Sequence, residues 1–165
     1  MSIILETSDC IAFRIPVNRN CTWEETILST RHSFDRSPYG PSPENVSAYK
    51  RVIDQMPRGG NAETEVVFFR AEEDHFCSWG LRYVTHTGID AAYKKLGLIP
   101  ADGYSLCAVN AHYPDFSKDK TNHTYWRIGG TRYSLSFSKE KYCISRCPTG
   151  GLLRAYRNWF AGIRV

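Results

Sequence analysis

The hydrophobic positions of two segments recur every three or four residues, which is the spacing of one buried helix face. The first segment follows Ser42-Pro43, a typical helix start, and carries its apolar residues at Val46, Tyr49, Val52, Ile53 and Met56. The second segment closes the chain, with apolar residues at Leu152, Leu153, Tyr156, Trp159 and Phe160. We therefore predict a helix on each of these segments.

Three further helices are indicated by signals at their ends. Thr22-Trp23-Glu24-Glu25 has the pattern of a capping box, a hydroxyl followed three residues later by a carboxylate, and predicts a helix that begins there. A second helix is expected to begin at Cys77 and to break at Gly88. Asp90 is expected to cap a third, short helix that stops at Gly97.

Strands are predicted where β-branched and aromatic residues concentrate between turn signals. These segments are 2–17, Glu65–Arg70, Tyr104–Ala111, His123–Ile128, Arg132–Ser138 and Lys141–Ser145. Gly129-Gly130 reads as a two-residue hairpin loop, which pairs Ile128 with Thr131 and places Ser136 opposite His123 on the same face. A three-residue loop would place Leu135 there instead.

At 165 residues, with 42% hydrophobic and 23% charged residues, the chain is expected to form one domain over residues 1–165. Residues 1–56 read as an N-terminal extension with helices, and 57–165 as the core. The net charge of +4 is mild and scattered, so it favours an anionic partner without selecting one, and nucleic acid is not expected.

No apolar run approaches the length of a membrane span, and the first residues lack the features of a secretory signal. We expect a protein that is cytoplasmic when made; any action outside the cell would require a specialised secretion system. The six cysteines include no C-x-x-C pair, so neither a metal site nor a cofactor is expected. The sequence does not decide whether Cys10 and Cys21, or Cys143 and Cys147, form disulfides.

Two residues suggest covalent chemistry. A thiol at the start of a helix, as predicted for Cys77, is shifted toward thiolate by the helix dipole. A strand histidine such as His123 can take the proton of that thiol. Ser136, opposite His123, can accept a hydrogen bond from the imidazole and hold its tautomer. The structural alternatives are a buried cysteine and an ordinary strand histidine.

The same segments resemble the NlpC-type cell-wall peptidases. The resemblance rests on Cys77-Ser78, Arg82-Tyr83-Val84, Gly88-Ile89, the His123 segment and Gly59-Gly60-Asn61. It implies an α+β, papain-like fold in which a nucleophile helix packs on a small antiparallel sheet. Phe76 stands where the family commonly has aspartate, and Trp79 where it commonly has glycine.

The resemblance further implies a hydrolase that cleaves amide bonds of peptidoglycan stem peptides, as a delivered toxin or phage enzyme. Cys77, His123 and Ser136 would be its catalytic residues, and Trp79 would hold the substrate. An immunity or inhibitor protein would be a fitting partner. A papain-like protease or deamidase acting on a host protein would use the same Cys77 and His123.

Two classes of function without a thiol nucleophile also remain open. Thr85-His86-Thr87-Gly88, Gly97-Leu98, Tyr133–Ser138 and Tyr142 loosely resemble segments of the ADP-ribosyltransferases. However, no glutamate follows Glu140 to serve as the usual catalytic residue of that superfamily. The second class is a non-enzymatic inhibitor or binding module, a function that requires no sequence motif.

Overall fold

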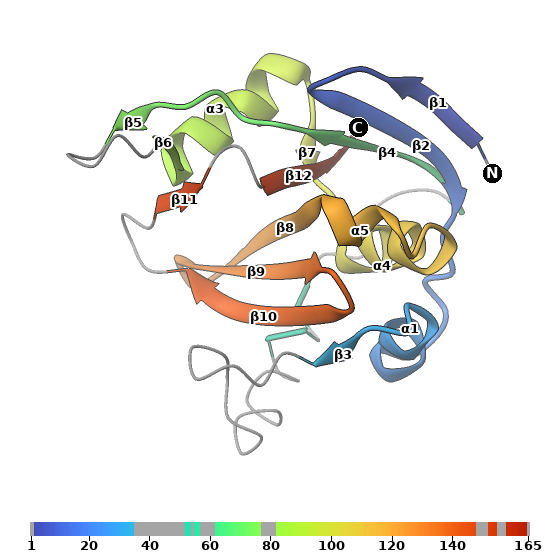
Figure 1. Cartoon of the computed structure of the whole chain (residues 1–165). Coiled ribbons are helices and arrows are strands. Elements are labelled where there is room, and N and C mark those ends of the chain that lie inside the picture. The colour runs from blue at the N-terminus through green and yellow to red at the C-terminus, as the bar shows by residue number, and fades with distance from the viewer. Residues whose placement is uncertain are drawn as a thin grey trace.

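The computed structural model describes residues 2–34, 52–53, 55–56, 62–76, 82–147, 152–154 and 158–164. Its centre is a nine-stranded mixed sheet with the order β1-β2-β4-β12-β8-β9-β10-β3, and β7 also pairs with β12 (Figure 1). A second sheet has three strands, in the order β11-β6-β5.

The first half of the chain contains β1 (Ser2–Glu6), β2 (Cys10–Pro16), α1 (Trp23–Ser29), β3 (Ser33–Phe34), β4 (Glu63–Phe69), β5 (His75–Phe76) and β6 (Arg82–Thr85). The second half contains α3 (His86–Leu96), β7 (Ile99–Pro100), α4 (Gly103–His112), α5 (Phe116–Asp119), β8 (Thr121–Ile128), β9 (Thr131–Ser138), β10 (Lys141–Cys147), β11 (Leu152–Arg154) and β12 (Asn158–Ile163).

The two faces of the large sheet have separate hydrophobic cores, because successive strand side chains point to opposite faces. Trp126 of β8 belongs to the core that α1, α4 and α5 cover. Its neighbour Tyr125 belongs to the other core, where Ile89 and Tyr93 of α3 pack against Phe160 of β12. We call this second surface the α3 face of the sheet.

The papain-like prediction, with a nucleophile helix on a small antiparallel sheet, is wrong. The main sheet is large and mixed, since β12 runs parallel to β8 and antiparallel to β4. The segment expected to form the nucleophile helix instead contains β6, whose Val84 pairs with Leu153 of β11. The helix that follows begins only at His86, and Gly88 lies in its first turn rather than at a break.

Two other predicted elements have the opposite secondary structure. Tyr104–Ala111, predicted as a strand, belongs to α4, and Leu152–Ala161, predicted as a helix, contains β11 and most of β12. Most residues of α4 and all of β12 are buried. Burial on all sides removes the polar positions that reveal a period, which explains both errors.

One local prediction is wrong: Asp90 lies inside α3, whose N-cap is Thr85, and does not cap a separate helix. The other local signals within the described residues are confirmed. Thr22 accepts a hydrogen bond from the Glu25 amide, and the Glu25 side chain accepts one from the Thr22 amide, as in a capping box. Gly97 ends α3 in the left-handed conformation, with φ of 63°. Gly129 and Gly130 both have positive φ, and Ile128 pairs with Thr131 as predicted. The helix predicted after Ser42-Pro43 lies mostly outside the described residues.

A buried ion pair joins the loop after β2 to the start of α4. The Arg19 guanidinium donates to Asp102 Oδ2 at 2.9 Å, and the Asp102 side chain is only 1% exposed. Asp102 is also the N-cap of α4, accepting from the Ser105 amide at 3.0 Å. This carboxylate therefore fixes the helix end and compensates a largely buried cation.

Replacing Asp102 with asparagine should lower the free energy of unfolding by about 3–5 kcal/mol, because it removes one partner of a buried charge pair. Chemical denaturation measures this loss. The exposed Asp119→Asn is the control and should change stability by less than about 0.5 kcal/mol. An equally small effect for Asp102→Asn would contradict the stabilising role of this ion pair.

Candidate functional site

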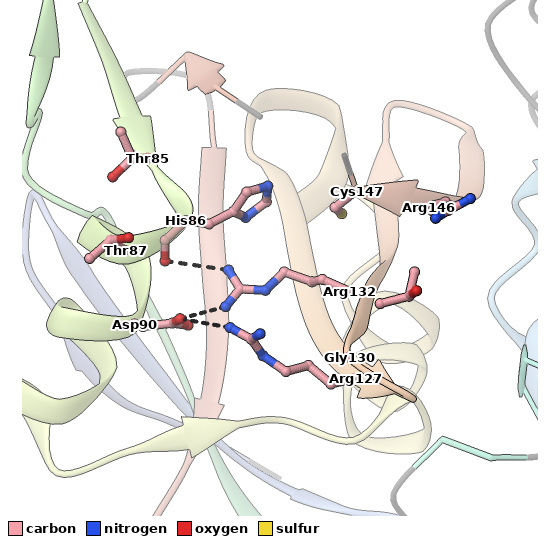
Figure 2. Close-up of a pocket in the computed structure, with 10 residues that line it drawn as sticks. Thr85, His86, Thr87, Asp90, Arg127, Gly130, Arg132, Arg146 and Cys147 are labelled. Atoms are coloured by element: carbon pink, nitrogen blue, oxygen red, sulfur yellow. Dashed lines mark hydrogen bonds and ion pairs between the residues drawn. The ribbon is translucent and has the colours of Figure 1, made fainter. Parts of the chain in front are cut away.

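A pocket of about 910 Å³ opens on the α3 face, between the β6–α3 junction and the β8–β9 hairpin (Figure 2). Most of its lining residues carry a polar or charged side chain: Thr85, His86, Thr87, Asp90, Arg127, Gly130, Thr131, Arg132, Arg146 and Cys147. The residues come from β6, α3, β8, β9 and β10 and from the hairpin loop. Only the tertiary fold brings them together.

The start of α3 is held in place by a carboxylate. Thr85 is the N-cap, and its hydroxyl accepts a hydrogen bond from the Gly88 amide at 3.1 Å. Asp74 in turn accepts from the Thr85 amide at 2.7 Å and from its hydroxyl at 2.5 Å. The Asp74 carboxylate is therefore an internal anion at the positive end of the helix dipole. By holding the start of α3, Asp74 also fixes the position of His86 at the pocket wall.

Two arginines stand directly opposite each other across the β8–β9 hairpin. Arg127 pairs with Arg132 in the strand register. Both donate to the same oxygen, Asp90 Oδ2, Arg132 at 2.5 Å and Arg127 at 3.2 Å. Arg132 is only 8% exposed and also donates to the His86 carbonyl. Like charges directly opposite on a sheet repel, and Asp90 offsets only one of the two charges.

Two polar atoms beside these arginines are buried and have no hydrogen-bond partner among the described residues. They are Nδ1 of His86 and the hydroxyl of Tyr125. The two rings lie 6.1 Å apart between centroids, and the Arg132 guanidinium lies 5.8 Å from the centre of the Tyr125 ring. An unsatisfied buried polar atom is costly, so both atoms require a physical explanation.

The surroundings of His86 favour its neutral imidazole form. Its burial, and then the nearby Arg132 charge, lower its pKa below the ordinary histidine value. Across the pocket, Cys147 points inward, while the Arg146 guanidinium points away from His86 (Figure 2). Burial raises the pKa of the Cys147 thiol. The pocket thus combines fixed positive charge with neutral polar groups.

The predicted catalytic histidine lies deeper in the same face. His123 is buried, and its Nε2 lies 2.5 Å from Oδ1 of Asn158. Burial lowers its pKa to about 4, although the Asn158 hydrogen bond acts in the opposite direction. Ser136 lies opposite His123, as the hairpin register predicted, but its hydroxyl donates to the Cys143 carbonyl.

Cys77 and Trp79, the predicted nucleophile and substrate-binding residue, lie outside the described residues. Their flanks are described: Phe76 of β5 pairs with Arg82 of β6 in an antiparallel ladder. The described part of the helix predicted from Cys77 to Gly88 is not one continuous helix, because Arg82–Thr85 forms strand β6 and α3 begins at His86. The roles predicted for Cys77, His123, Ser136 and Trp79 stay predictions.

The segments that resemble ADP-ribosyltransferases are divided between the two faces of the sheet. Thr85–Gly88 forms the strand-to-helix junction at the pocket. Tyr133 stacks on Trp126, in the core covered by α1, α4 and α5. Tyr142 packs on that same core, so neither tyrosine lies beside His86.

Sequence reasoning missed Arg127, Arg132 and Asp90. The signal for the arginines was present, because the predicted Gly129-Gly130 hairpin register itself places Arg127 opposite Arg132. Such a like-charge pair indicates a missing counter-anion. Asp90 gave no such signal, since its proximity to the hairpin depends on how α3 packs.

Cys10, Cys21, Cys107, Cys143 and Cys147 are free thiols, and Cys107 is buried in α4 rather than in the predicted strand. Within the described ranges, no three His, Cys, Asp or Glu side chains gather closely enough to hold a metal ion. No helix in those ranges is long and apolar enough to cross a membrane. Comparisons with protein-family models, curated proteins and solved structures found no match to this chain.

The lowered pKa of His123 predicts a loss of stability in acid. Between pH 6.5 and 4 the unfolded chain binds a proton at this residue that the folded chain does not, so protonation favours unfolding. This loss should reach on the order of 3 kcal/mol at pH 4. Denaturation curves of His123→Gln should therefore depend less on pH over this range than those of the wild type.

The exposed His112→Gln is the control, and its stability should keep the pH dependence of the wild type. A pH dependence of His123→Gln equal to that of the wild type would show that the burial of His123 does not govern acid stability.

Proposed function

We propose that this protein binds a phosphate-bearing small molecule in the pocket between α3 and the β8–β9 hairpin. The observation that carries the proposal is the pair Arg127 and Arg132, opposite each other at the pocket with one shared carboxylate. Guanidinium groups bind phosphate with parallel hydrogen bonds, which makes arginine well suited to this anion. A ligand phosphate would supply the charge that the pair lacks.

The size of the pocket supports a ligand larger than a free phosphate ion. Its volume of about 910 Å³ lies within the range of about 300–1,000 Å³ that is typical of small-molecule sites. His86 lines this pocket, and its buried Nδ1 is available to a neutral, polar part of the ligand. The Tyr125 hydroxyl is a second buried polar atom behind the lining, with its ring centroid 6.1 Å from that of His86. A nucleotide combines these two chemical parts, so we take nucleotides as the first ligand class to test.

ADP-ribosyl transfer is a second candidate, favoured by the Thr85–Gly88 segment, whose residues Thr85, His86 and Thr87 line this pocket. This segment is the part of the chain that resembles the histidine segment of those enzymes. The donor of ADP-ribose, NAD, carries phosphate and would be one of the nucleotides that the proposal covers. Release of nicotinamide from NAD would separate this activity from binding alone.

Hydrolysis of amide bonds by Cys77 and His123 stays a prediction, with peptidoglycan or a host protein as substrate. It requires that Cys77→Ala abolish the release of peptide fragments from peptidoglycan, because the nucleophile would be lost. Mass spectrometry of the digest measures these fragments. Retention of fragment release in Cys77→Ala would eliminate the thiol mechanism and leave the ligand-binding proposal unaffected.

Titration calorimetry with ADP tests the main proposal. The wild type should bind ADP, and Arg127→Gln should weaken binding at least about tenfold, because one of two charged donors to the phosphate is removed. Arg127 is 61% exposed, so this substitution should leave the fold intact. Affinity should also fall as the salt concentration rises.

The matched control is Arg14→Gln, which removes an exposed arginine from β2, outside the pocket lining. It should bind ADP as the wild type does. Equal weakening by Arg14→Gln and Arg127→Gln would show that ADP responds to overall charge rather than to this pocket, and would refute the proposal.

A further inference from the structure

We propose that Asp90 is an internal counter-anion which the ligand phosphate displaces from Arg127 and Arg132. The inference rests on the proposed function and adds a mechanism to it. In the ligand-free protein Asp90 would occupy the place of a phosphate oxygen. In the complex the two arginines would transfer their hydrogen bonds from the carboxylate to the ligand.

The geometry of the cluster is that of an anion site already filled by the protein. Terminal nitrogens of both guanidinium groups converge on the single oxygen Oδ2 of Asp90 (Figure 2). A bound phosphate would direct an oxygen to this same point, since that is where the two sets of donors meet. Carboxylate and phosphate cannot both occupy it, and their negative charges repel.

The free protein has a physical reason to keep such a carboxylate. Arg132 is 8% exposed, and a buried cation without a partner is strongly destabilising. Its other described contacts are with neutral groups, the His86 carbonyl at 3.3 Å and the Tyr125 ring, whose centre lies 5.8 Å from the guanidinium. Asp90 therefore stabilises the empty pocket until a ligand arrives.

Release of Asp90 is also physically accessible. Its side chain is 50% exposed, so the freed carboxylate can be hydrated at small cost, unlike a fully buried one. Arg127 is 61% exposed and can reorient toward a ligand. Arg132 remains anchored by the His86 carbonyl, so the pocket keeps one fixed cation during the exchange.

The first test compares Asp90→Asn with the wild type, using ADP as the probe. Without ADP, Asp90→Asn should melt at a lower temperature, because Arg132 has lost its carboxylate partner. It should bind ADP at least about tenfold more tightly, since no internal anion has to be displaced. Saturating ADP should also raise its melting temperature by more than it raises that of the wild type.

The control is Glu73→Gln, which removes the carboxylate partner of Arg82, a residue outside the pocket lining. Its affinity for ADP should equal that of the wild type. If Asp90→Asn binds ADP no more tightly than the wild type does, Asp90 only positions the arginines, and the displacement mechanism is overturned while the proposed function stands. If neither protein binds ADP, both proposals fail together.

A structure of the wild-type complex with ADP provides a second test that needs no substitution and holds even if Asp90→Asn is unstable. The expected result is a phosphate oxygen bonded to Arg132, with Asp90 turned away from both arginines. A complex in which Asp90 keeps its hydrogen bonds to Arg127 and Arg132 would overturn displacement, whatever the affinity of the variant.

Discussion

The C-terminal strand β12 holds the two halves of the large sheet together. It pairs antiparallel with β4, which joins it to β2 and β1, and parallel with β8, which joins it to β9 and β10. All six of its residues are buried, and Phe160 and Ala161 are fully inaccessible. Strands from the first and second halves of the chain are therefore joined into one sheet through β12.

The position of the pocket follows from that strand. The Tyr93 hydroxyl donates to the Ala161 carbonyl at 2.8 Å, and Ile89 is fully buried in the core shared with Phe160. These contacts fix the rotation of α3 about its axis. Asp90, next to Ile89, consequently points toward the β8–β9 hairpin, where it accepts a hydrogen bond from Arg132. A packing contact on β12 thus determines the charge arrangement of the site.

Two histidines on the same face of the sheet differ in their state. His123 has a hydrogen bond to Asn158 and lies among aromatic rings, so its polar requirement is met inside the fold. His86 has a buried nitrogen with no hydrogen-bond partner in the described part of the chain, and it lies at the pocket between α3 and the β8–β9 hairpin. Burial has different consequences for the two rings, because His123 is satisfied within the core, whereas His86 keeps an unsatisfied nitrogen at the pocket.

The sequence by itself determined the features that depend on a few neighbouring residues. The Thr22 capping box, the Gly97 helix end and the Gly129-Gly130 hairpin all form as predicted, because backbone hydrogen bonds and positive φ at glycine are local constraints. The predicted hairpin register also places Arg127 opposite Arg132, so the position of these two site residues could be predicted from the sequence.

The tertiary structure alone decided the rest. The segment around Cys107 forms helix α4, and Asn158–Ile163 forms strand β12. Burial on every side leaves no periodic pattern in either segment from which a helix could be distinguished from a strand. The pairing of β6 with β11 excluded the nucleophile helix, and the packing of α3 on β12 brought Asp90 to the arginines. Each of these outcomes depends on contacts between residues far apart in the chain, which local propensity does not specify.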